Sequence, residues 1–174
     1  GVQRHNFMAC VKHFALNSIE NSRCYVDVKA APRALHEVYL APIRTAVEAG
    51  VASVMSAYNR VNGEYCGHSR WLLEEVFRER WGFTGFVCSD WMWGVRDGLA
   101  AIRAGVDLEM PFARRYGRRL VAAVRAGRLD EGRIDACATR LLATRLAFAS
   151  RPDPEPYPPD TICREGHLLL SREV

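Results

Sequence analysis

Hydrophobic positions along the chain fall into short runs, separated by longer segments with helical spacing. Each run is rich in small, β-branched or aromatic residues, which is typical of strands buried in a sheet. We predict four strands, at 8–14 (MACVKHF), 51–59 (VASVMSAYN), 85–90 (GFVCSD) and 106–110 (VDLEM).

Helices are predicted between and after these strands, and proline, serine and glycine mark their ends. PRALHEVYL (32–40) has helical apolar spacing, and Pro42 begins a second helix that stops at Gly50. Ser69 stands at the N-cap of a helix that ends at Gly82. Two more helical regions are predicted, GVRDGLAAIRAG (94–105) and Arg118–Phe148 with a break near Gly127–Gly132.

This order gives four strand–helix units in series, which predicts an α/β fold with a parallel sheet and outer helices. A (β/α)8 TIM-type barrel needs about 250 residues. We therefore expect residues 1–150 to form part of such a barrel. RPDPEPYPPD (151–160) holds five of the eight prolines and predicts an extended linker, so residues 151–174 are expected to be a linker and the start of a helix leading to another domain.

Composition and charge limit the classes of partner that the chain is expected to bind. The chain is 49% hydrophobic and 25% charged, and it has no apolar run of membrane-spanning length, so no membrane partner is predicted. The net charge of +4 comes almost wholly from arginine. RRYGRR (114–119) is the densest basic stretch, but acidic residues flank it and aromatic interleaving is missing, so no nucleic-acid partner is predicted either. The cellular location stays open, with a slight preference for the cytoplasm.

The cysteines are scattered, and none forms the CxxC pair of a zinc site, so we predict no metal and no cofactor. Their positions are Cys10, Cys24, Cys66, Cys88, Cys137 and Cys163. Cys10 and Cys88 stand inside apolar runs and are expected to behave as small core residues.

Polar side chains gather where the predicted strands end, which is where βα folds place functional residues. They are Lys12, His13, Asn17, Ser56, Tyr58, Asn59, Ser89, Asp90, Trp91, Asp107 and Glu109. Hydroxyl-binding groups beside indole rings suit a sugar, which has hydroxyls to bind and C–H faces to stack. This position has two interpretations: Ser89 or Asp90 caps the following helix, or Asp90 is a reactive carboxylate beside an aromatic platform.

Lys12 and His13 are neighbours, and neighbours on a regular strand point to opposite faces. If both reach one pocket, the backbone must depart from regular strand geometry within Lys12–Phe14. We predict a bulge or a non-proline cis peptide there. Regular geometry, with His13 packed outward against a helix, would remove His13 from the site.

Four segments resemble the family 3 glycoside hydrolases, in particular their β-glucosidase branch. They are KHFALNSIENSR (12–23), SVMSAYNRVNG (53–63), GFTGFVCSDW (82–91) and AGVDLEMP (104–111), in the order in which that family has them. The resemblance implies that the chain is the second half of the family's N-terminal barrel. The first half-barrel and a C-terminal domain of the same parent chain would then be missing, and this fragment would be inactive alone.

The resemblance also implies roles for individual residues. Asp90, in SDW, matches the nucleophile of a retaining β-glycosidase, which forms a covalent glycosyl-aspartate. Lys12 and His13 match binders of sugar hydroxyls, Tyr58 would lie near the nucleophile, and Trp91 would form a wall of the pocket. The implied substrate is a small β-glucoside or an oligosaccharide, cleaved at its terminal non-reducing β-D-glucosyl residue.

The second carboxylate of the mechanism is not identified in the chain. Glu20 and Glu109 are candidates that we disfavour, and the resemblance implies a glutamate from the domain beyond the linker. A β-N-acetylglucosaminidase would carry a histidine–aspartate pair in the loop after KHF, and this chain has none. The same residues also allow a β-xylosidase, a Schiff-base aldolase using Lys12, and a non-catalytic carbohydrate-binding half-barrel.

Overall fold

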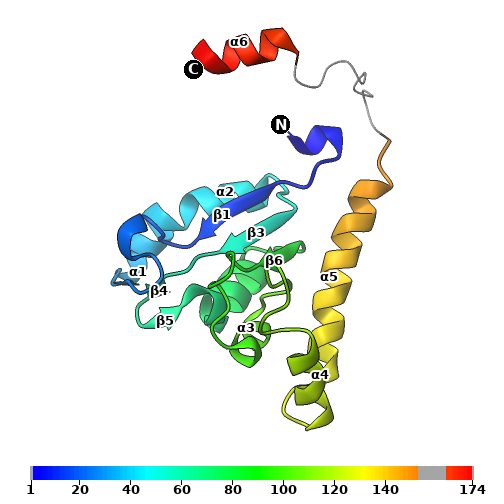
Figure 1. The fold of residues 1–174 in the computed structure, drawn as a ribbon. Helices are drawn as coiled ribbons and strands as arrows, with labels where there is room; N and C mark the ends of the chain where they lie inside the picture. Colours follow the sequence, from blue (N-terminus) through cyan, green and yellow to red (C-terminus); the bar gives the residue numbers. More distant parts are fainter. Residues whose placement is uncertain (1, 153–163, 174) are drawn as a thin grey trace.

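The protein is described by a computed structural model that covers residues 2–152 and 164–173. Its main sheet has three parallel strands in the order β1 (Cys10–Phe14), β3 (Ser53–Ser56) and β6 (Phe86–Cys88). Figure 1 shows β3 lying between β1 and β6. These strands lie inside the first three predicted runs, which confirms the parallel α/β fold predicted from the sequence.

The fourth predicted strand, 106–110, is reduced to a single parallel bridge between Leu108 and Cys88. A side chain replaces part of the ladder here, because Asp107 Oδ2 accepts the Val87 backbone N–H at 2.7 Å. The prediction of a regular strand was therefore wrong. Its position was right, since Leu108 continues the sheet beyond β6.

Helices follow the strands as the spacing predicts. The first pair is α1 (Pro32–Ala34), continued by the π-helical η3 (Leu35–Tyr39), and then α2 (Ala41–Glu48), which has Pro42 in its first turn. After β3 comes the π-helical η5 (Trp71–Arg80), and Ser69 Oγ accepts the Leu72 N–H at 3.3 Å, as expected of a cap. The remaining helices are α3 (Gly98–Ala104), α4 (Arg118–Arg125), α5 (Glu131–Ala149) and α6 (Glu165–Glu173).

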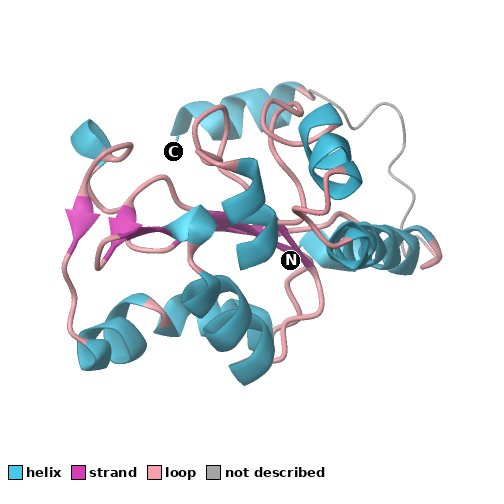
Figure 2. Ribbon diagram, turned by 90° about the horizontal axis from the view of Figure 1, so that it is seen from below, coloured by secondary structure: helices cyan, strands magenta, loops and turns pink. Residues whose placement is uncertain are grey.

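The two faces of the main sheet differ in what covers them. Val54 and Val87 are fully buried in the hydrophobic core that the strands share with the helices, and Val11 packs against that core. Figure 2 shows the strands as a central layer with helices on its flanks. Because side chains alternate along a strand, Cys10, Ser53, Met55 and Cys88 point to the opposite face. We call this second surface the inner face, as in a barrel whose helices lie outside.

A second, small sheet was not predicted. It pairs β2 (Asp27–Val28) in parallel with β4 (Arg60–Val61), and β4 in antiparallel with β5 (Glu64–Tyr65). Strands of two residues are too short to show a period of two, so the sequence carried no signal for them.

The remaining short elements are 3₁₀ turns: η1 (Val2–His5), η2 (Glu20–Ser22) and η4 (Cys66–His68). Most of the predicted proline-rich linker lies outside the described residues, while α6 confirms the helix expected in the tail. Within the described part of the chain, no helix is long and apolar enough to cross a membrane.

Candidate active site

Asp90 lies two residues beyond β6, at the carboxyl end of the sheet. Its residue surface is 6% exposed. Oδ1 accepts the Trp91 backbone N–H at 2.7 Å, whereas Oδ2 has no hydrogen-bond partner among the described residues. The nearest cation-forming group is His13, whose Nε2 lies 3.5 Å from Oδ2. One carboxylate oxygen is therefore held in place, and the other is buried without a hydrogen-bond partner.

Asp90 does not cap the helix that follows it. That cap is Asp97, whose Oδ1 accepts the Ala100 N–H at 2.8 Å at the start of α3. Ser89 is not the cap either, because its hydroxyl donates to the Asp90 carbonyl at 2.9 Å and accepts the Met110 N–H at 2.9 Å. The capping interpretation is wrong for both residues, and a loop separates β6 from α3.

The end of β1 departs from regular strand geometry, as predicted. The Lys12–His13 and Phe14–Ala15 peptide bonds are cis, and the register between β1 and β3 shifts between Val11 and Phe14. The His13 ring reaches Asp90, so His13 belongs to the same site as the carboxylate. Lys12 is exposed on the same strand.

Tyr58 lies behind the carboxylate. Its hydroxyl donates to the Trp91 carbonyl at 2.5 Å, and the residue is 7% exposed. Burial, together with the nearby charge of Asp90, raises the pKa of Tyr58 to about 12. The phenol therefore stays protonated at neutral pH and remains a hydrogen-bond donor beside Asp90.

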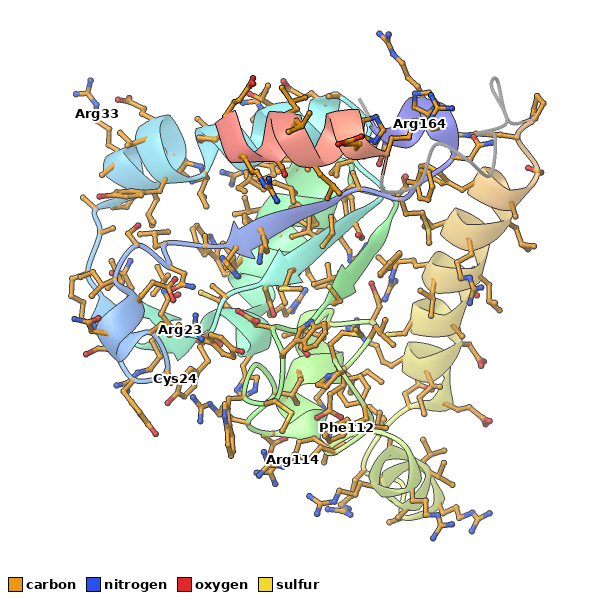
Figure 3. The ribbon with its side chains drawn as sticks, turned by 45° about the horizontal axis from the view of Figure 1, so that its top comes forward. Arg23, Cys24, Arg33, Phe112, Arg114 and Arg164 are labelled. Carbon is orange, nitrogen blue, oxygen red and sulfur yellow. The ribbon has the colours of Figure 1, made fainter. Side chains whose placement is uncertain are left out.

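Aromatic rings border the site on the solvent side. Trp91 and Trp93 are 51% and 47% exposed, and no cation–π contact covers Trp91 among the described residues. The Arg114 guanidinium lies 4.4 Å from the centroid of the Trp93 ring. Figure 3 shows Arg114 beside Phe112, while Arg23 and Cys24 lie on the side toward which β1 points.

The loop after β1 supports the site from outside. Arg23 pairs with Glu20, and its guanidinium lies 5.1 Å from the centroid of the Tyr58 ring. The hydrogen bond to Glu20 raises the pKa of Arg23. The Asn17 amide is 3.5 Å from Glu20. These contacts place the Arg23 guanidinium over the Tyr58 ring, near enough for the charge of Asp90 to add to the rise in the pKa of Arg23.

Asn59 and Ser56 come from β3 and the turn after it. The Asn59 amide is fully buried and donates to the Ala15 carbonyl at 3.1 Å, which fixes the chain just after the second cis peptide. Ser56 is fully buried, and its Oγ has no hydrogen-bond partner in the described part of the chain.

Two residues of the predicted strand-end set do not reach the site. The Asp107 carboxylate turns toward the helices, where it accepts from Arg78 at 2.6 Å and from Arg140 at 2.7 Å. The Glu109 carboxylate accepts the backbone N–H groups of Arg115 and Tyr116, each at 2.8 Å. Both carboxylates therefore stabilise the fold around the site. For Glu109, this agrees with the expectation that it is not a catalytic residue.

Gly94 was missed by reasoning from the sequence. A β-carbon added there would lie 2.7 Å from the Asp90 backbone nitrogen and still closer to the Asp90 carbonyl oxygen. Only a residue without a side chain fits against the Asp90 backbone in this way. The glycine in DWMWG was visible in the sequence, but its spatial neighbour was not.

No group of three or more histidine, cysteine, aspartate or glutamate side chains is placed to hold a metal ion in residues 2–152 or 164–173. The site contains a buried carboxylate with one unpaired oxygen, a histidine 3.5 Å from that oxygen, a protonated phenol and an indole ring.

Known proteins share both the sequence and the geometry. The profile of the glycosyl hydrolase family 3 N-terminal domain matches residues 1–144. A β-glucosidase of Rhizobium radiobacter is 45% identical over 88% of the chain, and thermostable β-glucosidase B of Acetivibrio thermocellus is 42% identical over all of it. These matches take up 19% and 23% of the two relatives, so the chain spans about a fifth of their length.

Among solved structures, DesR, a β-glucosidase from Streptomyces venezuelae in complex with D-glucose, superposes with a TM-score of 0.85 at 31% identity. The match covers 99% of this chain and 24% of DesR.

Proposed function

Because the chain belongs to glycosyl hydrolase family 3, we propose that it is part of the catalytic barrel of a retaining β-glucosidase. The proposed reaction releases terminal non-reducing β-D-glucosyl residues from small β-glucosides or oligosaccharides. The observation that carries the proposal is that Asp90 Oδ2, buried at the carboxyl end of β6 beside His13, has no hydrogen-bond partner among the described residues.

Asp90 is the proposed nucleophile. In a double displacement, the carboxylate attacks the anomeric carbon and the leaving group departs, giving a glycosyl ester that water then cleaves. A nucleophile needs one oxygen free and the carboxylate held in orientation. The Trp91 N–H holds Oδ1, and Oδ2 is free. This division of the two oxygens fits the role.

The groups around Asp90 are the proposed sugar-binding set. Lys12 and His13 supply donors for hydroxyl groups, and the protonated Tyr58 hydroxyl stays next to the carboxylate. The exposed face of Trp91 offers a stacking surface for the C–H face of a pyranose ring. Arg23 supports Tyr58 without touching Asp90 in this arrangement.

The general acid is proposed to come from outside this chain. Glu20 is engaged by Arg23, and the Glu109 carboxylate accepts two backbone N–H groups. Each is already used as a structural acceptor. We therefore infer that a domain beyond residue 174 of the parent protein supplies the acid, and that the N-terminal part of the barrel also lies outside this chain.

A Schiff-base aldolase fits this geometry less well. A Schiff-base lysine is itself the reacting group, whereas the buried, unpaired atom at this site belongs to the Asp90 carboxylate beside His13. The loop that follows β1 contains no histidine–aspartate pair, which also disfavours an N-acetylglucosaminidase. A β-xylosidase differs from a β-glucosidase only in the substrate's exocyclic group, so it is tested directly by assay.

The test uses the full-length parent protein, expressed from its complete gene. Hydrolysis of aryl β-glucoside, β-xyloside and β-N-acetylglucosaminide is measured side by side, and β-glucoside is expected to be turned over fastest. A 2-fluoro-glucoside that traps the ester should label the peptide that contains Asp90. Labelling of another carboxylate, or full turnover by Asp90→Asn, would overturn the assignment.

A further inference from the structure

The loop between Asp90 and α3 rests on η4, an element that the proposed reaction does not use. We call residues 91–97 the β6–α3 loop. A β-carbon added to Gly67 of η4 would lie 2.8 Å from the Gly94 carbonyl oxygen, so the two backbones pack closely. Gly94 in turn packs against the Asp90 backbone, where an added β-carbon would lie 2.7 Å from the nitrogen. A shift of the loop away from η4 would therefore move the backbone of Asp90.

The His68 ring is the second contact between η4 and this loop. Its Nε2 lies 3.2 Å from the backbone nitrogen of Arg96 and 3.3 Å from that of Asp97, and it accepts both N–H groups. A ring nitrogen of histidine accepts hydrogen bonds only when it carries no proton, so these contacts require the neutral ring protonated on Nδ1. The imidazolium would direct an N–H group at two other N–H groups. The contact therefore exists in only one protonation state of His68.

The start of α3 depends on this ring. Asp97 is the N-cap of α3, and its carboxylate accepts the Ala100 N–H at 2.8 Å. In a capping box, a glutamate or glutamine three residues after the N-cap accepts the N-cap N–H in return. That position is Ala100 here, which has no acceptor in its side chain. His68, from a distant part of the chain, takes over this role.

Arg96 ties the same end of the loop to two further elements. Its Nη2 donates to the Cys24 carbonyl at 2.8 Å, in the segment after β1. Its guanidinium lies 5.2 Å from the centroid of the Tyr65 ring on β5. Both partners of each contact belong to this chain. The His68 ring therefore holds a junction between the segment after β1, β5, η4 and the β6–α3 loop.

We propose that His68 is a positioning residue for the proposed reaction. Its neutral ring holds the β6–α3 loop on η4, and protonation of the ring releases the loop and displaces Asp90 and Trp91. The effect on turnover rests on the proposed function, whereas the release of the loop does not.

The surroundings of His68 set the direction of its pH dependence. The groups that face it are Glu64 and Tyr65 from β5, and Arg96 and Asp97 from the loop. Burial lowers the pKa of His68, Arg96 lowers it further, and the charges of Asp97 and Glu64 oppose this. The folded protein therefore binds this proton less readily than the unfolded chain does. The contact is complete above about pH 6.5 and is lost as the pH falls through the lowered pKa.

The test follows amide hydrogen exchange of the Arg96–Asp97 peptide by mass spectrometry in the full-length parent protein, corrected for the intrinsic pH dependence of exchange. Between pH 7.5 and pH 4.5, protection in the wild type should fall by more than about threefold. His68→Gln should keep its protection, because the glutamine oxygen accepts hydrogen bonds and does not titrate. His68→Ala should be unprotected at both pH values. His167→Gln is the control, because it removes an exposed histidine of α6 and should match the wild type.

Turnover of aryl β-glucoside is measured on the same proteins. His68→Ala should lose at least about tenfold at pH 7.5, since displaced reacting groups cost turnover. His68→Gln should restore most of this loss and should lose less activity than the wild type on acidification. Protonation of Asp90 affects both proteins equally, so the difference between their pH profiles reports His68.

Constant protection of the wild-type loop from pH 7.5 to pH 4.5 would overturn the proposal, whether or not the variants fold. An equal fall in His68→Gln would also overturn it. Release of the loop in a parent protein that hydrolyses no β-glucoside would refute the proposed enzyme and support the role of His68 in holding the loop. Hydrolysis by a protein whose loop stays protected would do the reverse.

Discussion

Asp90 and Asp107 are buried carboxylates in neighbouring segments of the same sheet, and the structure satisfies them in opposite ways. Asp107 Oδ2 accepts from Arg78 at 2.6 Å and from the Val87 N–H at 2.7 Å, while Oδ1 accepts from Arg140 at 2.7 Å. Asp90 accepts one backbone N–H on Oδ1, and its Oδ2 has no partner within the described residues. Both residues are less than a tenth exposed.

The contrast shows what each carboxylate does. A buried charge surrounded by cations and N–H donors holds elements together, and Asp107 joins β6 to η5 and α5 in this way. A buried oxygen without a partner is costly for folding, and this cost fits the nucleophile role proposed for Asp90. Three substitutions and one alkylation experiment test this difference between the two carboxylates and their surroundings.

The largest effect is expected from Asp90→Asn in the parent protein. An amide keeps the acceptor for the Trp91 N–H but removes the attacking oxygen, so β-glucoside turnover should fall by at least about 10⁴-fold. The free energy of unfolding should change by less than about 0.5 kcal/mol, because the Trp91 N–H keeps its acceptor and Oδ2 has no hydrogen bond to lose. Steady-state kinetics and urea unfolding measure the two quantities. A large loss of stability would mean that Asp90 resembles Asp107 after all.

The next effect is on stability, from Asp107→Asn. The buried Arg78 would lose its counter-charge, and we expect the free energy of unfolding to fall by about 3–5 kcal/mol. Glu37→Gln is the control, because the Arg33–Glu37 pair is exposed on both sides and its loss should barely move the urea midpoint. Equal midpoints for the two variants would contradict the structural role of Asp107.

A smaller effect is expected from Gly94→Ala. The new β-carbon would press on the Asp90 backbone, and a displacement of about 1 Å can cost on the order of 10²-fold in turnover. Gly166→Ala is the matched control, since a β-carbon there meets no atom within 4 Å. Kinetics of both variants measure the effect. Unchanged kinetics in Gly94→Ala would show that Asp90 tolerates movement of its backbone.

The smallest effect is on cysteine alkylation, compared between Cys10 on the Asp90 side of the sheet and Cys137 beside Asp107. The hydrogen bond from Cys88 lowers the pKa of Cys10 to about 6, whereas burial, and then the charge of Asp107, raises the pKa of Cys137 to about 12. The thiolate reacts with iodoacetamide, so alkylation of Cys10 should rise through pH 6 and level off above it. Cys137 should stay unreacted up to pH 9. Peptide mapping by mass spectrometry follows both, and a Cys10 rate still climbing above pH 8 would contradict the assignment.

Much of the fold was predictable because its signals are local. The runs at Cys10–Phe14, Ser53–Ser56 and Phe86–Cys88 are short and apolar, and proline, serine and glycine mark the helix ends. The departure from strand geometry at Lys12–His13 was also predictable, since two adjacent polar residues were assigned to one pocket. The sheet of β2, β4 and β5 was not, because its strands are too short to show a period.

The site was predictable as a set of residues but not as an arrangement. Asp90, Asp107 and Glu109 all stand at predicted strand ends, and the residues next to them in the sequence do not distinguish their roles. Asp97 proved to be the helix cap, a role the sequence also allowed to Asp90. The family resemblance singled out Asp90, and the positions of distant side chains show why the other two carboxylates are engaged elsewhere.

The sequence by itself determined the alternation of strands and helices, the edge where polar residues collect, and the family, because periodicity and motifs are properties of neighbours in the chain. Only the tertiary structure decided which carboxylate keeps a free oxygen. Asp107 is satisfied by Arg78 and Arg140, 29 and 33 positions away, and His13 reaches Asp90 across the intervening strand β3. Hydrogen-bond satisfaction is a property of neighbours in space, and folding alone brings those neighbours together.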